Sequence, residues 1–170
     1  PRETVFRGYT TLVGSRGGKK VGCNLQCDRI GYGGSGAVPS GTFEGTMVMS
    51  DHLDGGRWNG HGMDDLSTRH LGHTPISYKE VTGTHKARVT FDFVPLRKAT
   101  DYAAEDADVT LRLYLKFRER LWREQATRIY KTVDRPLIPV VAGMERAGIL
   151  VDRQQLSTMS AAFETEIALL

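Results

Sequence analysis

The pattern of apolar and polar residues along the chain predicts a mostly helical protein. Gly72, Gly83 and Gly148 each follow a stretch with helical periodicity, and glycine at such a position typically ends a helix. Asp152 opens the last such stretch, with Gln155 three residues later in a capping-box arrangement. The predicted helices cover 46–53, 63–72, 77–83, 101–124, 134–148 and 152 onward.

Strand signals are weaker than helix signals. Residues 20–25 are predicted as a short strand or the end of one, and 89–95 alternate as a strand or as an extended lead-in to the next helix. Glycine, serine and proline dominate 31–41, a composition typical of turns. With 170 residues, the chain is expected to form one domain or slightly more than one.

The helix predicted at 101–124 begins with four carboxylates within eight residues. Acids at a helix start complement the helix dipole by about 0.3–1 kcal/mol each, which accounts for Asp101, while Glu105 and Asp108 are expected to stay in solvent. Asp106 differs because it lies one turn after Tyr102, on the apolar face. Burial of a carboxylate is costly unless it is paired or binds a metal, so Asp106 is a candidate for either role. The apolar face consists of Tyr102, Val109, Leu113 and Phe117.

A second polar pair follows the short strand predicted at 20–25. Asn24 and Asp28 stand where a helix would begin, and their pattern alone favours an ordinary helix cap over a functional role. Mg2+ and Mn2+ prefer carboxylates and water, and two-metal phosphoryl chemistry takes its acids from separate elements. Asp28 is therefore a candidate partner for Asp106 in a metal site.

Composition and charge set broad limits. A net charge of +3 permits a polyanionic partner without requiring one. Cys23 and Cys27 are too few for a disulfide scaffold, and their C-x3-C spacing is unusual for a metal or redox site, so reduced thiols in the cytosol are expected. His61, His70 and His73 have no cysteine nearby, and zinc is not expected there. No apolar run approaches the ~18 residues of a membrane span.

Several stretches, in unbroken order, resemble bacterial DNA polymerase I. YAAEDADVTLRL resembles the third motif of its 3′-5′ exonuclease domain, the Y-x3-D signature, and VGCNLQCD is similar to the second motif. GMDDLSTRHLGHTPISYKEVTG resembles the segment between them. DRPLIPVVAGMERAGILVDRQQL is similar to the first helices of the polymerase domain. The resemblance extends from about residue 20 to the C-terminus.

The resemblance implies an α/β, ribonuclease H-like fold and a proofreading activity. The exonuclease part would occupy 1–124 and the start of the polymerase domain, at the base of the thumb, 125–170. Two Mg2+ or Mn2+ ions would serve the hydrolysis of a DNA 3′ end. Asp28 and Asp106 would hold these metals, and Tyr102 would orient the attacking water.

The same resemblance assigns the DNA contacts. Asn24 would contact the strand near the cleaved end, and Tyr78 would stack on unpaired terminal bases. A partly buried packing role is an equal alternative for Tyr78. The whole protein would be a monomeric, cytoplasmic, nucleoid-associated bacterial enzyme that acts on single-stranded 3′ ends in replication and repair, with no membrane partner.

Three positions depart from the family pattern. The family places an Asp-x-Glu pair well before its second motif, and the only acid before Asn24 is Glu3. Cys27 replaces an aromatic residue, and Gly45 stands where an acid is expected. The chain is therefore expected to be a polymerase fragment that is inactive alone. A catalytically dead domain that binds DNA or braces the polymerase is one alternative. A ribonuclease D-like exoribonuclease is another, disfavoured by the polymerase-like segment after Arg135.

Overall fold

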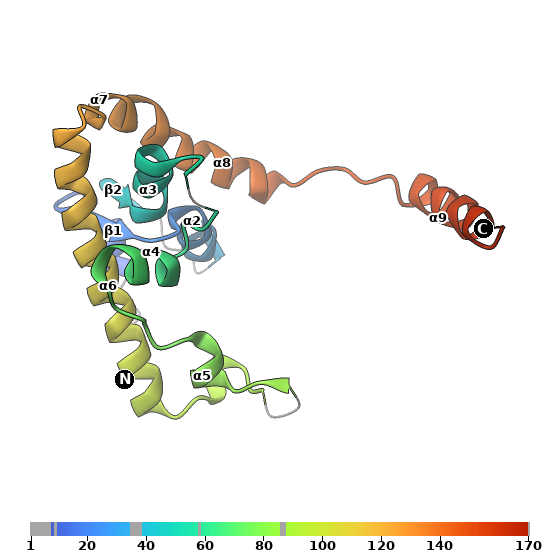
Figure 1. The fold of residues 1–170 in the computed structure, drawn as a ribbon, viewed down its shortest axis with the longest axis horizontal. Helices are drawn as coiled ribbons and strands as arrows, with labels where there is room; N and C mark the ends of the chain where they lie inside the picture. The colour runs from blue at the N-terminus through green and yellow to red at the C-terminus, as the bar shows by residue number, and fades with distance from the viewer. Residues whose placement is uncertain (1–7, 9, 35–38, 58, 86–87, 170) are drawn as a thin grey trace.

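The computed structural model describes residues 8, 10–34, 39–57, 59–85 and 88–169, and it is a mostly helical α/β structure with a small parallel sheet. A single long helix, α6, runs along one side, and shorter helices pack on it (Figure 1). The elements are β1 (Lys19–Gly22), α2 (Leu25–Gly34), β2 (Thr42–Gly45), α3 (Thr46–Asp54), α4 (Met63–Leu71), α5 (Tyr78–Thr82), η2 (Phe91–Phe93), α6 (Leu96–Arg123), α7 (Thr127–Ile129), η3 (Tyr130–Asp134), α8 (Arg135–Ala147) and α9 (Arg153–Ile167).

The sheet consists of β1 and β2, which run parallel in register from Lys19 beside Thr42 to Gly22 beside Gly45. Parallel strands need a crossover, and α2 with the segment after it supplies it. The strand predicted near 20–25 is confirmed. β2 was not predicted, because its buried residue Glu44 is charged and breaks the apolar pattern of a strand. The predicted turn at 31–41 begins too early, since α2 continues to Gly34; residues 35–38 lie outside the described part.

The core is built on the apolar face of α6. Val109, Leu113 and Phe117 are fully buried there, as the helical spacing predicted. They pack against Met49 of α3 and Leu66 of α4. The helix begins at Leu96, directly after Pro95, which is earlier than the predicted start at 101. Both α3 and α4 thus pack on α6.

The predicted helix ends are confirmed where glycine or a side-chain cap sets them. Gly72 ends α4 in the left-handed conformation, with φ 64°. Ser77 and Glu80 form a capping box at α5, and the Asp152 side chain accepts hydrogen bonds from the first turn of α9. The strand considered at 89–95 is wrong: its centre is the 3-10 turn η2.

Residues 127–147 are helical throughout, and η3 is a π-helical turn between α7 and α8. Pro136 and Pro139 lack the N–H groups that a regular helix would use. At η3 the Arg135 N–H instead bonds to the carbonyl of Tyr130, five residues earlier. Glu44 of β2 anchors this helical segment, because it accepts a hydrogen bond from Tyr130 at 2.8 Å and one from Arg135 at 3.1 Å.

The C-terminal helices differ in their packing. α8 contacts α2 and β2 and buries Ile138 and Ala142. α9 lies beyond α8, joined by an extended segment, and contributes no buried residue (Figure 1). Within the described residues, no helix is both long and apolar enough to cross a membrane.

Candidate active site

Asp28 lies in the first turn of α2, close to the end of β1. A Cβ atom added at Gly22 would be only 2.7 Å from the Asp28 Oδ2 atom, so glycine is what lets the carboxylate approach the strand end. Burial raises the pKa of Asp28 above its ordinary value. No cation among the described residues lowers the pKa of Asp28, which distinguishes it from a structural ion-pair acid.

Asp106 projects from α6, one turn after Tyr102. Its Oδ1 atom is buried and has no hydrogen-bond partner among the described residues. Burial raises the pKa of Asp106, and the charges of Asp64 and Glu105 raise it further, while the Tyr102 hydroxyl acts in the opposite direction. Burial and the neighbouring Asp106 raise the pKa of Tyr102 to about 12. The inward orientation predicted for Asp106 is confirmed.

Cys23, directly after β1, connects the two acids in space. Its thiol interacts with Thr46, and burial raises its pKa most. The charges of Asp28, Asp106 and Asp64 each raise the pKa of Cys23 as well, so all three carboxylates lie near the carboxyl end of β1. The sequence had not singled out Asp64, because an acid in the first turn of a helix is ordinarily a dipole partner.

The chemistry of these acids fits a hard divalent cation. The buried Oδ1 atom of Asp106 accepts no hydrogen bond from the described residues, so it is available as a ligand atom. Mg2+ commonly binds one or two protein carboxylates and fills its other positions with water and substrate phosphate. Among the described residues no three His, Cys, Asp or Glu side chains form a ready metal cluster. The metal-binding role of Asp28 and Asp106 therefore stays a prediction.

Tyr78 belongs to an aromatic cluster beside Tyr102. Its ring is nearly parallel to Phe91, with centroids 6.0 Å apart, and meets Tyr102 edge-on at 6.2 Å. The side chain is still 42 % exposed. The packing role of Tyr78 is therefore observed, and its exposed surface leaves stacking on DNA bases as a prediction.

Asn24 occupies the start of α2. Its Oδ1 atom accepts a long hydrogen bond of 3.5 Å from the Cys27 N–H, and its carbonyl accepts one of 3.1 Å from the Asp28 N–H. Asn24 therefore caps the helix that carries Asp28. The cap fixes the first turn of α2 and with it the backbone position of Asp28.

Comparison with known proteins identifies the family. A profile of the 3′-5′ exonuclease family matches residues 2–122. DNA polymerase I of Rhizobium leguminosarum is 51 % identical over 144 residues, which cover 83 % of the chain. The chain belongs to the 3′-5′ exonuclease family of bacterial DNA polymerase I.

Other relatives agree with this assignment. DNA polymerase I of Pseudomonas aeruginosa is 34 % identical over 167 residues, or 94 % of the chain, and that of Treponema pallidum is 35 % identical over 118 residues, or 69 %. The chain spans only 14 %, 18 % and 11 % of the Rhizobium, Pseudomonas and Treponema proteins. The family resemblance read from the sequence is thereby confirmed, and the fold class is that of this ribonuclease H-like family.

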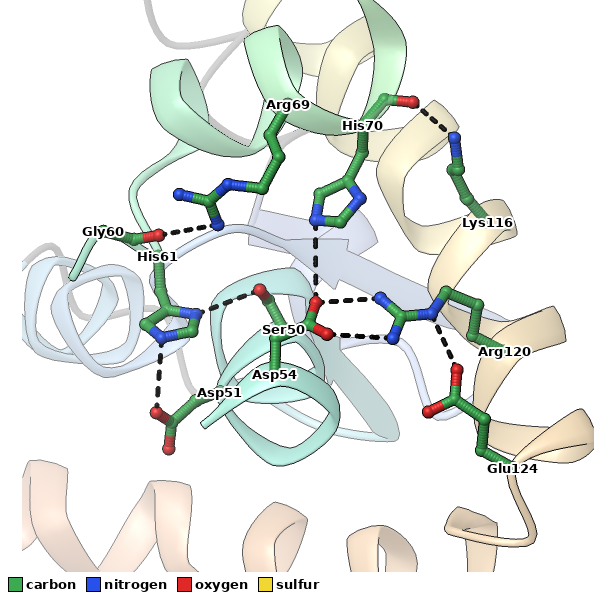
Figure 2. Close-up of polar contacts among 10 residues, drawn as sticks. All are labelled: Ser50, Asp51, Asp54, Gly60, His61, Arg69, His70, Lys116, Arg120 and Glu124. Carbon is green, nitrogen blue, oxygen red and sulfur yellow. Dashed lines mark hydrogen bonds and ion pairs between the residues drawn. The ribbon is translucent and has the colours of Figure 1, made fainter. Parts of the chain in front are cut away.

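A separate polar network holds the helices of this exonuclease region together (Figure 2). Asp54 of α3 accepts two hydrogen bonds from the Arg120 guanidinium, at 2.8 and 2.9 Å. The hydrogen bond from Arg120 is the main reason that the pKa of Asp54 is lowered. Arg120 also donates to Glu124 at 2.9 Å, and the Lys116 ammonium donates to the His70 carbonyl. These contacts tie α3 and α4 to α6.

The three histidines considered for zinc each face a different carboxylate. His61 lies 3.7 Å from Asp51, and His70 lies 3.7 Å from Asp54. His61 also hydrogen-bonds Ser50 at 3.0 Å (Figure 2). Ser50 is fully buried, so this serine–histidine pair cannot present a nucleophile to a substrate.

His73 and Glu105 correct one expectation from the sequence. Glu105 was expected to stay in solvent, but it contacts His73 at 2.8 Å and accepts a hydrogen bond of 2.6 Å from the Ile76 N–H. The Ile76 bond is the largest cause of the lowered pKa of Glu105. The carboxylate thereby fixes the segment that leads into α5 and Tyr78.

Proposed function

We propose that this chain is part of a DNA polymerase I and contributes to the removal of 3′-terminal nucleotides by metal-dependent hydrolysis. The observation that carries the proposal is the unsatisfied, buried Oδ1 atom of Asp106 beside the Tyr102 hydroxyl. The match to an exonuclease family supports the same proposal, and so does the position of Asp28 at the end of the parallel strand β1. Replication and repair are the processes that such a proofreader serves.

Asp28 and Asp106 are the residues that would hold divalent cations. Bound Mg2+ or Mn2+ would supply an activated water and stabilise the leaving oxygen. Each carboxylate is partly buried, and no cation among the described residues lowers its pKa, so a bound metal would relieve an existing electrostatic cost. Their raised pKa values mean that metal binding and proton binding compete at these two groups.

Tyr102 orients the water. With a pKa of about 12, its hydroxyl stays protonated at neutral pH and can donate one hydrogen bond while it accepts another. Its place one helical turn from Asp106 keeps this hydroxyl close to the carboxylate. Tyr102 thus acts by position and not as a base.

The DNA strand lies over Tyr78 and Asn24 in this proposal. A terminal base stacked on Tyr78 would gain about 1–3 kcal/mol without a sequence preference, as a proofreader requires. Asn24 contacts the strand from the start of α2. The exonuclease part occupies 1–124, the polymerase domain begins within 125–170, and an Asp-x-Glu pair earlier in the polymerase completes the site. The enzyme works as a cytoplasmic monomer, and the 170 residues alone are inactive.

The test compares the full polymerase with its Asp106→Asn variant on 5′-labelled single-stranded DNA with Mg2+. The variant is expected to lose measurable exonuclease activity and to retain nucleotide addition. Degradation that continues unchanged in the variant would refute the proposal. DNA binding that is equal in both proteins and insensitive to EDTA, with neither degrading DNA, would instead identify a domain that braces the polymerase on DNA.

A further inference from the structure

Three aromatic rings from three elements form a closed cluster at the start of α6. Tyr78 comes from α5, Phe91 from η2 and Tyr102 from α6. The centroids of Tyr78 and Phe91 are 6.0 Å apart with planes at 16°. Phe91 and Tyr102 are 5.8 Å apart at 59°, and Tyr78 and Tyr102 are 6.2 Å apart at 69°. Each ring therefore contacts both others in an offset or edge-on geometry that aromatic pairs favour.

Backbone hydrogen bonds hold Phe91 in place from both sides. The Val89 N–H donates to the Thr82 carbonyl at 2.9 Å, which joins the segment before Phe91 to the end of α5. The Val94 N–H donates to the Phe91 carbonyl at 3.1 Å, which closes η2 just before α6 begins. Phe91 thus lies in the short link between the element that carries Tyr78 and the one that carries Tyr102.

Phe91 lies at the protein surface, where a large apolar ring gains less from burial. It is 36 % exposed, and Tyr78 beside it is 42 % exposed. A ring that only filled the core would be expected among the buried residues farther along α6. Instead Phe91 restricts the two tyrosines, one with exposed surface and one whose hydroxyl lies beside Asp106.

We infer that Phe91 is a positioning residue of the exonuclease site, which couples base stacking on Tyr78 to the placement of the Tyr102 hydroxyl. The inference rests on the proposed function. A base that stacks on Tyr78 contacts a ring that packs on both Phe91 and Tyr102. Phe91 in turn packs on Tyr102. Without Phe91, Tyr102 loses one of its two ring neighbours in the cluster, and its hydroxyl can move away from the position that orients water. Small displacements of a positioning group lower a reaction rate steeply.

The first measurement is steady-state exonuclease kinetics of the full polymerase and its Phe91→Ala variant on single-stranded DNA. We expect kcat to fall about tenfold with KM changed less than about twofold, since the variant misplaces a catalytic group more than it removes a binding surface. Phe93→Ala is the matched control: Phe93 lies in the same turn, is 75 % exposed, and its loss is expected to leave both constants unchanged.

The second measurement separates positioning from a general loss of structure. A DNA whose 3′-terminal base is 2-aminopurine reports stacking by fluorescence quenching, with binding followed by anisotropy in Ca2+. Phe91→Ala is expected to reduce the quenching at saturating protein, Phe91→Tyr to restore both quenching and kcat, and Phe93→Ala to change neither. Phe91→Leu keeps apolar volume without a ring, so a folded Leu variant should resemble Phe91→Ala.

The outcomes distinguish this inference from the proposed function. If Asp106→Asn abolishes hydrolysis while Phe91→Ala and Phe91→Leu match Phe93→Ala in kcat and quenching, the positioning role is refuted and the exonuclease proposal stands. If Phe91→Tyr fails to restore activity to a folded protein, the positioning role is also refuted. If Asp106→Asn hydrolyses DNA normally, the proposed function itself is wrong.

Discussion

Asp54 of α3 faces α6, Asp106 lies on α6 itself, and the two acids differ in the groups that surround them. Asp54 is 4 % exposed and meets the Arg120 guanidinium through two hydrogen bonds, which lower its pKa. Asp106 has a raised pKa and a buried oxygen that no described residue hydrogen-bonds. The comparison shows that α6 carries a matched charge that holds helices together near one end and an unmatched charge near the other. An unmatched buried acid is the better indicator of a functional site.

The largest effect is expected from breaking the matched pair. Arg120→Met leaves Asp54 buried without its cation and should destabilise the chain by about 3–5 kcal/mol. Urea denaturation measures this change. Arg123→Met is the control, since Arg123 lies one turn from Glu119 in a pair that is exposed, and exposed pairs contribute about 0–1 kcal/mol. Equal midpoints for the two variants would show that the Asp54 pair does not hold α3 on α6.

Divalent cations should have the next largest effect on stability, and this effect should depend on Asp106 and not on Asp54. At one hundred times its Kd, a bound metal would add about 2.7 kcal/mol to the stability of the native state. Mn2+ or Mg2+ is therefore expected to raise the urea midpoint of the full polymerase, and the shift should be much smaller in Asp106→Asn. Asp54→Asn serves as the control that keeps the metal shift. A full shift in Asp106→Asn would remove Asp106 from the metal site.

The pH dependence should have opposite signs at the two acids, measured in EDTA. The folded pKa of Asp54 lies below its ordinary 3.8, so its stabilisation is present above that pH and is lost as the pH falls through the lowered pKa. The folded pKa of Asp106 lies above 3.8, so its contribution is complete below that pH and is lost as the pH rises through the raised pKa.

Asparagine variants make this difference measurable. Relative to the parent protein, Asp54→Asn should become more destabilising as the pH rises above about 4, and Asp106→Asn should become less destabilising or stabilising over the same change. The second effect is the smaller one, because Asp106 is only partly buried. Parallel pH profiles for the two variants would contradict the contrast between matched and unmatched acids.

Local signals made much of the fold predictable. The helical spacing of Val109, Leu113 and Phe117 gave the buried face of α6, and Gly72 gave the end of α4. The relation of Tyr102 to Asp106 was also predictable, because residues four apart on a helix lie on one face.

The features that sequence reasoning missed depend on distant partners. β2 contains the buried Glu44, whose partners Tyr130 and Arg135 lie 86 and 91 residues away, so no local pattern marks it as a strand. Asp64 joins the site only because α4 packs on α6, and Phe91 only because η2 returns to α5. The environment of these residues is set by tertiary contacts, which the spacing of residues along the sequence does not reveal.

The continuous helix between Asp106 and Arg120 has a consequence for how this gene region can change in length. The two residues are fourteen positions apart on α6, or about 21 Å at 1.5 Å per residue. One inserted or deleted residue between them would turn one end relative to the other by about 100°, so either the site or the Asp54 pair would face the wrong way. Homologous genes should therefore keep this interval free of insertions and deletions, and accumulate them instead in the extended segment between α8 and α9.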